Sequence, residues 1–281
     1  MSDIDVGPAP ELRYRHKVSL MTAARGLWHS RELVLTLAER DVRARYKQMF
    51  LGFAWAFVQP LSMTLVLTIA NRKGVGADLD THGVPASLVN YLGLIVWGFF
   101  ASSVLGGGLS LLANTSLLNK VRCPREAFPI ASMAVATMDA AIASIALFVM
   151  FAVTGHGPRG TSFYIVPLLV VLIVFTLAVT LAIAALVVYI RDLRSVLPLA
   201  LQLGLLVSLL LPLGKTQNAS MLFWCALDPI APVIDGVRRA VLFGQAPRWN
   251  LVGIAALSSS IMLVLAWNLF TKLEKGMADV L

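Results

Sequence analysis

Long apolar segments with almost no charge are the feature of this sequence that most limits its fold. Six of them recur along the chain, over residues 49–70, 88–112, 127–154, 162–190, 196–213 and 250–271. A hydrocarbon core of about 30 Å is crossed by about 20 helical residues, because each residue of an α-helix rises about 1.5 Å. Backbone polar groups in lipid must be hydrogen-bonded within the segment, which favours helices. The sequence therefore predicts an all-α polytopic membrane protein with six transmembrane helices.

Composition and charge agree with a membrane protein. Hydrophobic residues make up 58% of the chain and charged residues only 14%, whereas soluble domains average about 25% charged residues. The net charge of +8 comes from cations that flank the apolar segments, so we expect no nucleic-acid partner. With a cytoplasmic N-terminus, 16 of the 23 lysines and arginines lie on the inner side. We therefore predict an inner (plasma) membrane protein with both termini cytoplasmic.

We divide the chain into a cytoplasmic tail (1–29), a basic segment (30–48), the transmembrane domain (49–271) and a second cytoplasmic tail (272–281). The basic segment has a regular pattern of its own. Apolar side chains recur at Val34, Ala38, Val42 and Tyr46, and charged side chains occupy the opposite face. This spacing is typical of an amphipathic helix. A basic polar face next to a membrane span predicts an interfacial helix in contact with membrane lipids.

The outer segment 214–249 does not fit a simple span either. It is apolar in stretches of about ten residues, interrupted by Pro229, Pro232 and Asp235, and each stretch is too short to cross a bilayer. We expect two re-entrant or interfacial helices before the last span, over residues 221–227 and 233–243.

No motif for catalysis or metal binding is present, so we expect no catalytic residue, no metal and no cofactor bound by this chain. The tripeptide at 214–216 (GKT) resembles a phosphate-binding loop, but Leu209 stands where that loop needs its first glycine. The glycines of 106–108 are expected to allow close helix packing or a kink. Asp139 is the one acidic residue well inside a span. Two interpretations remain for Asp139: a structural hydrogen bond between helices, or a functional group.

Several segments together resemble one family. They are RYKQMFLGFAWAFVQP, NTSLLNKVRCPREAFP and LDPIAPVIDGVRRAVLFG, in this order. They resemble the membrane subunit of ABC-2-type polysaccharide exporters, a group that includes Wzm-type O-antigen, teichoic-acid and cell-wall galactan permeases. The resemblance runs from about Leu33 to the C-terminus. Gln59-Pro60 and Asp228-Pro229 stand where the family often has Asn-Pro, so the prolines are kept and the polar partner differs.

The resemblance implies a homodimer that binds two copies of a separate ABC ATPase, which carries ATP and Mg²⁺, and exports a lipid-linked polysaccharide such as a galactan or O-antigen. The residues expected to bind the pyrophosphate or glycan are Arg40, Arg43, Arg45, Lys47, Trp55, Phe57 and Trp97. Those expected at the ATPase contact are Leu117, Leu118, Asn119, Lys120, Val121, Arg122, Arg125 and Glu126. Those expected at an outer gate are Phe223, Trp224, Asp228, Pro229, Arg238 and Arg239.

Three other functions remain as alternatives. An ABC-2 permease for a drug or lipid would have the same helices, but the basic helix and the Pro-Arg-Glu loop (124–126) favour polysaccharide. A membrane-embedded transferase acting on polyprenyl phosphates would need metal-binding acids, which are missing. A self-sufficient carrier would need more than one charged residue inside the spans.

Overall fold

The computed structural model describes residues 31–47, 54–72, 81–118, 124–210, 223–225, 227–274 and 276–277. Every regular element in these ranges is a helix, which confirms the all-α prediction. The elements are α2 (Arg31–Tyr46), α3 (Trp55–Arg72), α4 (Ala86–Ala113), α5 (Thr115–Leu118), α6 (Ala127–Thr154), the 3-10 helix η2 (Gly160–Tyr164), α7 (Ile165–Tyr189), α8 (Leu193–Leu210), α10 (Ile230–Arg238), the π-helix η3 (Arg239–Phe243) and α11 (Trp249–Glu274).

Four helices within the described ranges are long and apolar enough to cross a membrane. They are α4, α6, the continuous helix of η2 and α7, and α11. The other two predicted spans, 49–70 and 196–213, correspond to α3 and α8, whose apolar parts are shorter within the described residues. Both of these predicted spans extend into residues outside the described ranges. By length and composition, four helices in the described ranges are therefore candidate membrane spans, and the count of six stays a prediction.

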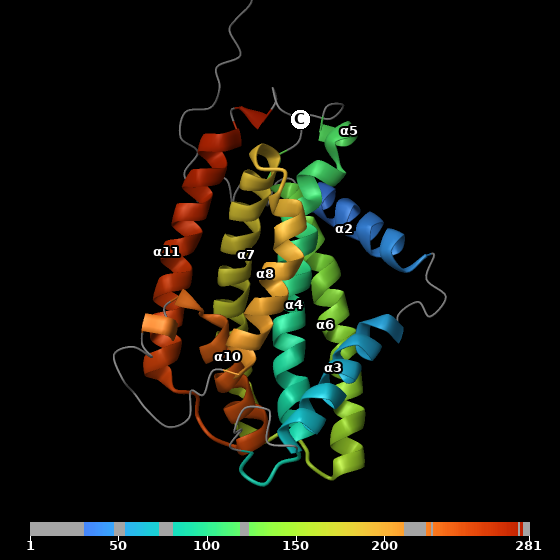
Figure 1. Ribbon diagram of the computed structural model, residues 1–281, viewed down its shortest axis with the longest axis vertical. Helices are drawn as coiled ribbons and strands as arrows, with labels where there is room; N and C mark the ends of the chain where they lie inside the picture. The colour runs from blue at the N-terminus through green and yellow to red at the C-terminus, as the bar shows by residue number, and fades with distance from the viewer. Residues whose placement is uncertain are drawn as a thin grey trace, which may run out of the picture.

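Helix α4 lies at the centre of the bundle. It packs against α3, α6, α7, α8 and α10, and Leu88, Tyr91, Val104 and Leu111 along its length are buried almost completely. Figure 1 shows α4, α6, α7, α8 and α11 running along the long axis of the molecule. We call the upper end in this view, which carries α5 and the end of α11, the α5 end, and the opposite end the α10 end.

Helices α4 and α7 approach closely at two glycines. A Cβ atom added at Gly107 would lie 2.4 Å from Cγ2 of Thr180, and one added at Gly108 would lie 2.6 Å from Cγ2 of Ile183. Both distances are shorter than real Cβ atoms show. The missing side chains therefore allow two apolar helices to pack with their backbones close together, as in many membrane helix pairs.

At the α10 end, α10 and η3 turn back into the bundle and pack against α4, α7 and α11. The two elements cover residues 230–243, close to the re-entrant helix predicted for 233–243. The other predicted helix, 221–227, lies partly outside the described residues. Backbone N–H of Arg159 donates to the carbonyl of Val241 over 3.0 Å, and the Thr161 hydroxyl donates to the carbonyl of Ala240 over 2.6 Å. These bonds attach η3 to the segment before α7.

Candidate functional site

Helix α2 is docked on α6 by its apolar face. Leu37 and Ala38 are buried in the core at the α5 end, and Leu33 and Val34 pack against the same cluster. These are side chains of the apolar face that the sequence predicts. The cations Arg40, Arg43 and Arg45 on α2, and Lys47 directly after its last residue, are all exposed. The burial of one face thus fixes the height and rotation at which these cations lie beside α4 and α6 (Figure 1).

Asp139, near the middle of α6, is bound by three side chains from two other helices. Arg45 Nη1 lies 3.1 Å from Asp139 Oδ2, and the Tyr46 hydroxyl donates to Asp139 Oδ1. The Ser102 hydroxyl of α4 donates to Asp139 Oδ2 over 3.3 Å and accepts a bond from Arg45 Nη1 over 3.2 Å. We call Arg45, Tyr46, Ser102 and Asp139 the Asp139 cluster. It joins α2, α4 and α6.

The charges in the Asp139 cluster compensate one another. A carboxylate on an apolar helix is strongly disfavoured unless it is paired and hydrogen-bonded, and Arg45 and the two hydroxyls meet this need. Partial burial, together with the hydrogen bond and charge of Asp139, raises the pKa of Tyr46 above its ordinary value, so the phenol keeps its proton and acts as donor. Arg45 is 44% exposed, against 18% for Asp139. The cation is thus accessible from outside the protein while its partner carboxylate is mostly covered.

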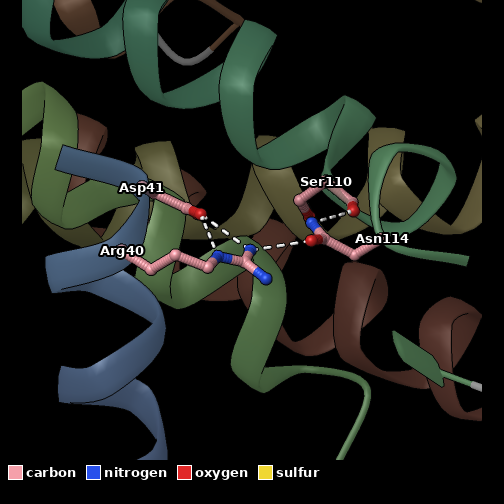
Figure 2. Close-up of polar contacts among 4 residues, drawn as sticks. All are labelled: Arg40, Asp41, Ser110 and Asn114. Atoms are coloured by element: carbon pink, nitrogen blue, oxygen red, sulfur yellow. Dashed lines mark hydrogen bonds and ion pairs between the residues drawn. The ribbon is translucent and has the colours of Figure 1, made fainter. Parts of the chain in front are cut away.

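A second polar contact joins α2 to the end of α4 (Figure 2). Arg40 Nη2 donates to Asp41 Oδ1 and to Asn114 Oδ1, both over 2.7 Å. Asn114 Nδ2 donates to the carbonyl of Ser110 over 2.8 Å, and the Asn114 carbonyl accepts bonds from the backbone of Leu117 and Leu118. Asn114 therefore ends α4, starts α5 and binds α2 at the same time. We call Arg40, Asp41, Ser110 and Asn114 the Asn114 junction.

The predicted ATPase contact begins directly after this junction. Leu117 and Leu118 are half-buried in α5, whereas Asn119, Lys120, Val121 and Arg122 lie outside the described residues. Arg125 Nη1 donates to the carbonyl of Glu274, at the end of α11, over 2.7 Å. Glu126 precedes the first residue of α6. The segment between α4 and α6 is thus attached to α2 on one side and to α11 on the other, and its contact with an ATPase stays a prediction.

The other residues predicted to bind substrate are dispersed. Arg43 pairs with Glu39 one turn away on α2. Trp55 is half-exposed at the start of α3 and Phe57 is half-buried. Trp97 is buried, and its ring lies against Phe100, with centroids 5.3 Å apart, and against Gly204 of α8. Of the residues predicted to bind substrate, Arg45 belongs to the Asp139 cluster and Arg40 to the Asn114 junction, and α8 covers the Trp97 ring.

The residues predicted for an outer gate fall into an exposed and a buried group. Phe223 and Trp224 are exposed with ring centroids 6.1 Å apart. Pro229 is buried, and Asp228 accepts bonds from the Ser208 hydroxyl and from the backbone of Ile230. The two arginines bind backbone carbonyls: Arg238 is buried with Nε 3.0 Å from the oxygen of Val89, and Arg239 Nε donates to Ala246 over 3.1 Å. Both arginines thus hold η3 and its neighbours in place.

Ser102 and Asn114 were not predicted as site residues. Ser102 lies in an apolar span where a hydroxyl ordinarily bonds to its own helix, and Asn114 lies in the first turn after that span. Ser102 is one of several polar residues in its span, beside Asn90, Ser103 and Ser110, so the sequence carries no signal that singles it out. Within the described residues, no group of His, Cys, Asp and Glu could hold a metal ion.

Comparison with known proteins places these clusters in a family context. The family model described as ABC-2 type transporter matches residues 32–242. The chain is 26% identical over 267 residues to the O-antigen export system permease protein RfbA of Myxococcus xanthus, covering 92% of this chain and 99% of that protein. It is 22% identical over 251 residues to RfbA of Klebsiella pneumoniae, covering 89% and 95%. The capsule polysaccharide export inner-membrane protein CtrC of Neisseria meningitidis is 29% identical over 104 residues, 37% of each chain. The family match includes the Asp139 cluster and the Asn114 junction.

Proposed function

The chain belongs to the ABC-2 type transporter family, and we propose that it is the membrane subunit of an ATP-driven exporter of a lipid-linked polysaccharide. Relatives that it matches over 89% and more of its length are named O-antigen export permeases. The observation in this chain that carries the proposal is the basic helix α2 docked on α6, which together with the next residue, Lys47, carries four exposed cations. Such cations suit an anionic lipid headgroup better than a neutral cargo.

The architecture that we propose is a homodimer of six-span subunits with two copies of an ABC ATPase. The ATPase binds ATP and Mg²⁺ and contacts the segment between α4 and α6, which is bonded to α2 through Asn114 and to α11 through Arg125. The α5 end faces the cytoplasm in this arrangement, in keeping with the excess of cations there. Hydrolysis on the ATPase would then move a segment that is attached to both the first and the last described helix.

The headgroup of the substrate binds on α2. Asp139 lies 12 residues from the start of α6 and Ser102 lies 11 residues before the end of α4, so both are about 16–18 Å from the α5 end. Helices α4 and α6 have 28 residues each, so each is about 42 Å long and exceeds a hydrocarbon core of about 30 Å by about 12 Å. We propose that this extra length extends beyond the core at the α5 end. Arg45 then lies within about 5 Å of the hydrocarbon boundary, so a polyprenyl tail stays in lipid while its pyrophosphate meets Arg and Lys donors at the interface.

Depletion of the chain in its native cells tests this function. The proposal predicts that lipid-linked polysaccharide accumulates on the cytoplasmic side, and that the purified chain carries an ABC ATPase with it. Replacing Arg43, Arg45 and Lys47 together by Gln should give the same accumulation. The control replaces two exposed cations at the same end by Gln: Arg191, between α7 and α8, and Arg194, in the first turn of α8. Normal export after depletion would contradict the proposal, and an equal defect in the control would show that net charge alone matters.

A further inference from the structure

The Asp139 cluster has the form of an anion site that a protein carboxylate already fills. Its donors come from two helices, with Arg45 and Tyr46 on α2 and Ser102 on α4, and its acceptor comes from a third. All three donors point at one pair of oxygen atoms. A phosphate group presents the same kind of acceptor, with at least two terminal oxygens and a negative charge, and guanidinium groups bind phosphate and carboxylate in the same geometry.

We propose that Asp139 is the resident occupant of a phosphate-binding cradle made by Arg45, Tyr46 and Ser102, and that it competes with the phosphate of the incoming lipid-linked substrate. This inference rests on the proposed function, because it takes from it that the substrate carries a phosphate. A phosphate at Arg45 would place a second negative charge against the Asp139 carboxylate. The carboxylate must therefore release the donors before a phosphate takes them, and Asp139 sets how tightly the substrate binds.

The partners of the other α2 arginines single out Arg45. Arg40 pairs with Asp41 and Arg43 pairs with Glu39, so the carboxylate in each case belongs to α2 itself. The carboxylate at Arg45 belongs to α6. Exchange of a carboxylate for a phosphate at Arg45 therefore also removes a contact that holds the end of α2 on α6, whereas exchange at Arg40 or Arg43 leaves the docking of α2 unchanged.

The cluster is accessible to a ligand. Arg45 is 44% exposed, so a phosphate can approach the guanidinium from the side that Asp139 leaves open. The Asn114 junction lies one to two turns before Arg45 on α2 and fixes the helix independently. Loss of the Asp139 contact would thus free the end of α2 while its first half stays attached through Leu37, Ala38 and Arg40.

The alternative is a clamp, in which Asp139 only holds Arg45 in place for the substrate. The two roles predict opposite effects when the carboxylate is neutralised. If Asp139 competes with phosphate, neutralising its carboxylate should let phosphate bind more tightly. If Asp139 only holds Arg45 in place, neutralising it should release Arg45, and phosphate should bind less tightly. The change Asp139→Asn keeps the shape of the side chain and removes the charge, so it separates the two roles.

The test measures binding of farnesyl pyrophosphate and of inorganic pyrophosphate to the full chain in phosphatidylcholine nanodiscs. Asp139→Asn should tighten binding about tenfold, because one like charge near contact is removed from a partly exposed site. The matched control is Asp41→Asn, which removes an equal charge from α2 beside Arg40 and should change binding less than about twofold. Unchanged or weaker binding by Asp139→Asn would overturn the proposal, and so would an equal gain in the control.

Ser102→Ala in the Asp139→Asn chain provides a second test, because no carboxylate then competes for the Ser102 hydroxyl. It should weaken pyrophosphate binding about tenfold relative to Asp139→Asn alone, since one hydrogen bond to a charged ligand is lost, and no effect would overturn the role of the cradle. Arg45→Gln separates this inference from the proposed function. If Arg45→Gln weakens binding while Asp139→Asn also weakens it, the substrate site stands and Asp139 is a clamp. If depletion leaves polysaccharide export unchanged, the proposed function fails whatever the binding constants show.

Discussion

Arg40 and Asn114 are joined by a 2.7 Å hydrogen bond although 74 positions separate them in the chain. Asn114 is also the residue at which α4 ends and α5 begins, and its side chain is held to Ser110 (Figure 2). A shift of α5 therefore moves the acceptor of Arg40 and pulls on α2. The bond gives the segment between α4 and α6 a direct mechanical connection to the basic helix.

Asn114→Ala should lower export more than it lowers ATP hydrolysis by the assembled transporter. The substitution removes the Arg40 acceptor but keeps the Asn114 backbone carbonyl, which accepts the bonds from Leu117 and Leu118 in α5. The measurement is the amount of polysaccharide exported per ATP hydrolysed, which we expect to fall several-fold. Asn268→Ala is the control, because within the part of the chain that the structure describes the Asn268 amide donates to the carbonyl of Val264 on its own helix. An unchanged ratio in Asn114→Ala would contradict a role in coupling.

Arg125→Ala should loosen the end of α11. The guanidinium donates to the carbonyl of Glu274, and a cation at a helix C-terminus is favourable for the helix dipole as well. We expect a loss of about 1 kcal/mol in the free energy of local opening. Hydrogen exchange of the backbone amides at residues 270–274 measures it. Lys272→Ala, which removes a cation from the same turn, should change exchange less. Equal protection of these amides in Arg125→Ala and in the unsubstituted chain would show that Arg125 does not stabilise the end of α11.

Gly107→Ala should reduce the yield of folded protein, whereas Gly106→Ala should be tolerated. A Cβ at Gly107 meets Thr180 at 2.4 Å and the Pro129 carbonyl oxygen at 3.0 Å, while a Cβ at Gly106 has Ser132 at 4.0 Å as its nearest neighbour. Overpacking of this kind costs about 1–3 kcal/mol. Thermal stability of the purified variants in detergent measures the difference. Equal stability would show that α4 and α7 do not pack as described.

Cysteine labelling tests which side of the membrane each end occupies. In a cysteine-free background, Ser195→Cys at the start of α8 should react with an impermeant maleimide only after the membrane is opened. Gly157→Cys, in the exposed segment before α7, should react in intact cells. These outcomes place the α5 end in the cytoplasm. The reverse pattern would contradict the orientation inferred from charge.

The helix ends were predictable where the sequence carries strong local signals. The predicted span 127–154 coincides with α6, because Pro124 precedes the helix and Gly155 ends it in a left-handed conformation with φ 68°. The glycines of 106–108 were expected to allow close helix packing or a kink, and Gly107 and Gly108 lie at a close contact. The length of an apolar segment and the residues that stop a helix are local properties of the chain, so they can be read from the sequence alone.

The site was less predictable because its members come from distant segments. Asp139 was recognised as costly in a span, but its partners Arg45 and Tyr46 lie more than 90 positions earlier. Which face of α6 meets α2 depends on the packing of Leu37 and Ala38, which periodicity does not give. Arg238 shows the reverse case. The family resemblance implies a place at an outer gate, and the structure shows in addition that Arg238 is buried against Val89, which the sequence did not indicate.

ATP-dependent transport into inverted membrane vesicles tests the central claim most directly. Vesicles that contain the chain and its ATPase partner would be supplied with lipid-linked polysaccharide on the outer, cytoplasmic surface. The account predicts that the polysaccharide enters the lumen only with hydrolysable ATP, and that the Arg45→Gln chain slows its entry at least tenfold while Arg194→Gln does not. Entry without ATP, or at an equal rate with Arg45→Gln, would contradict it.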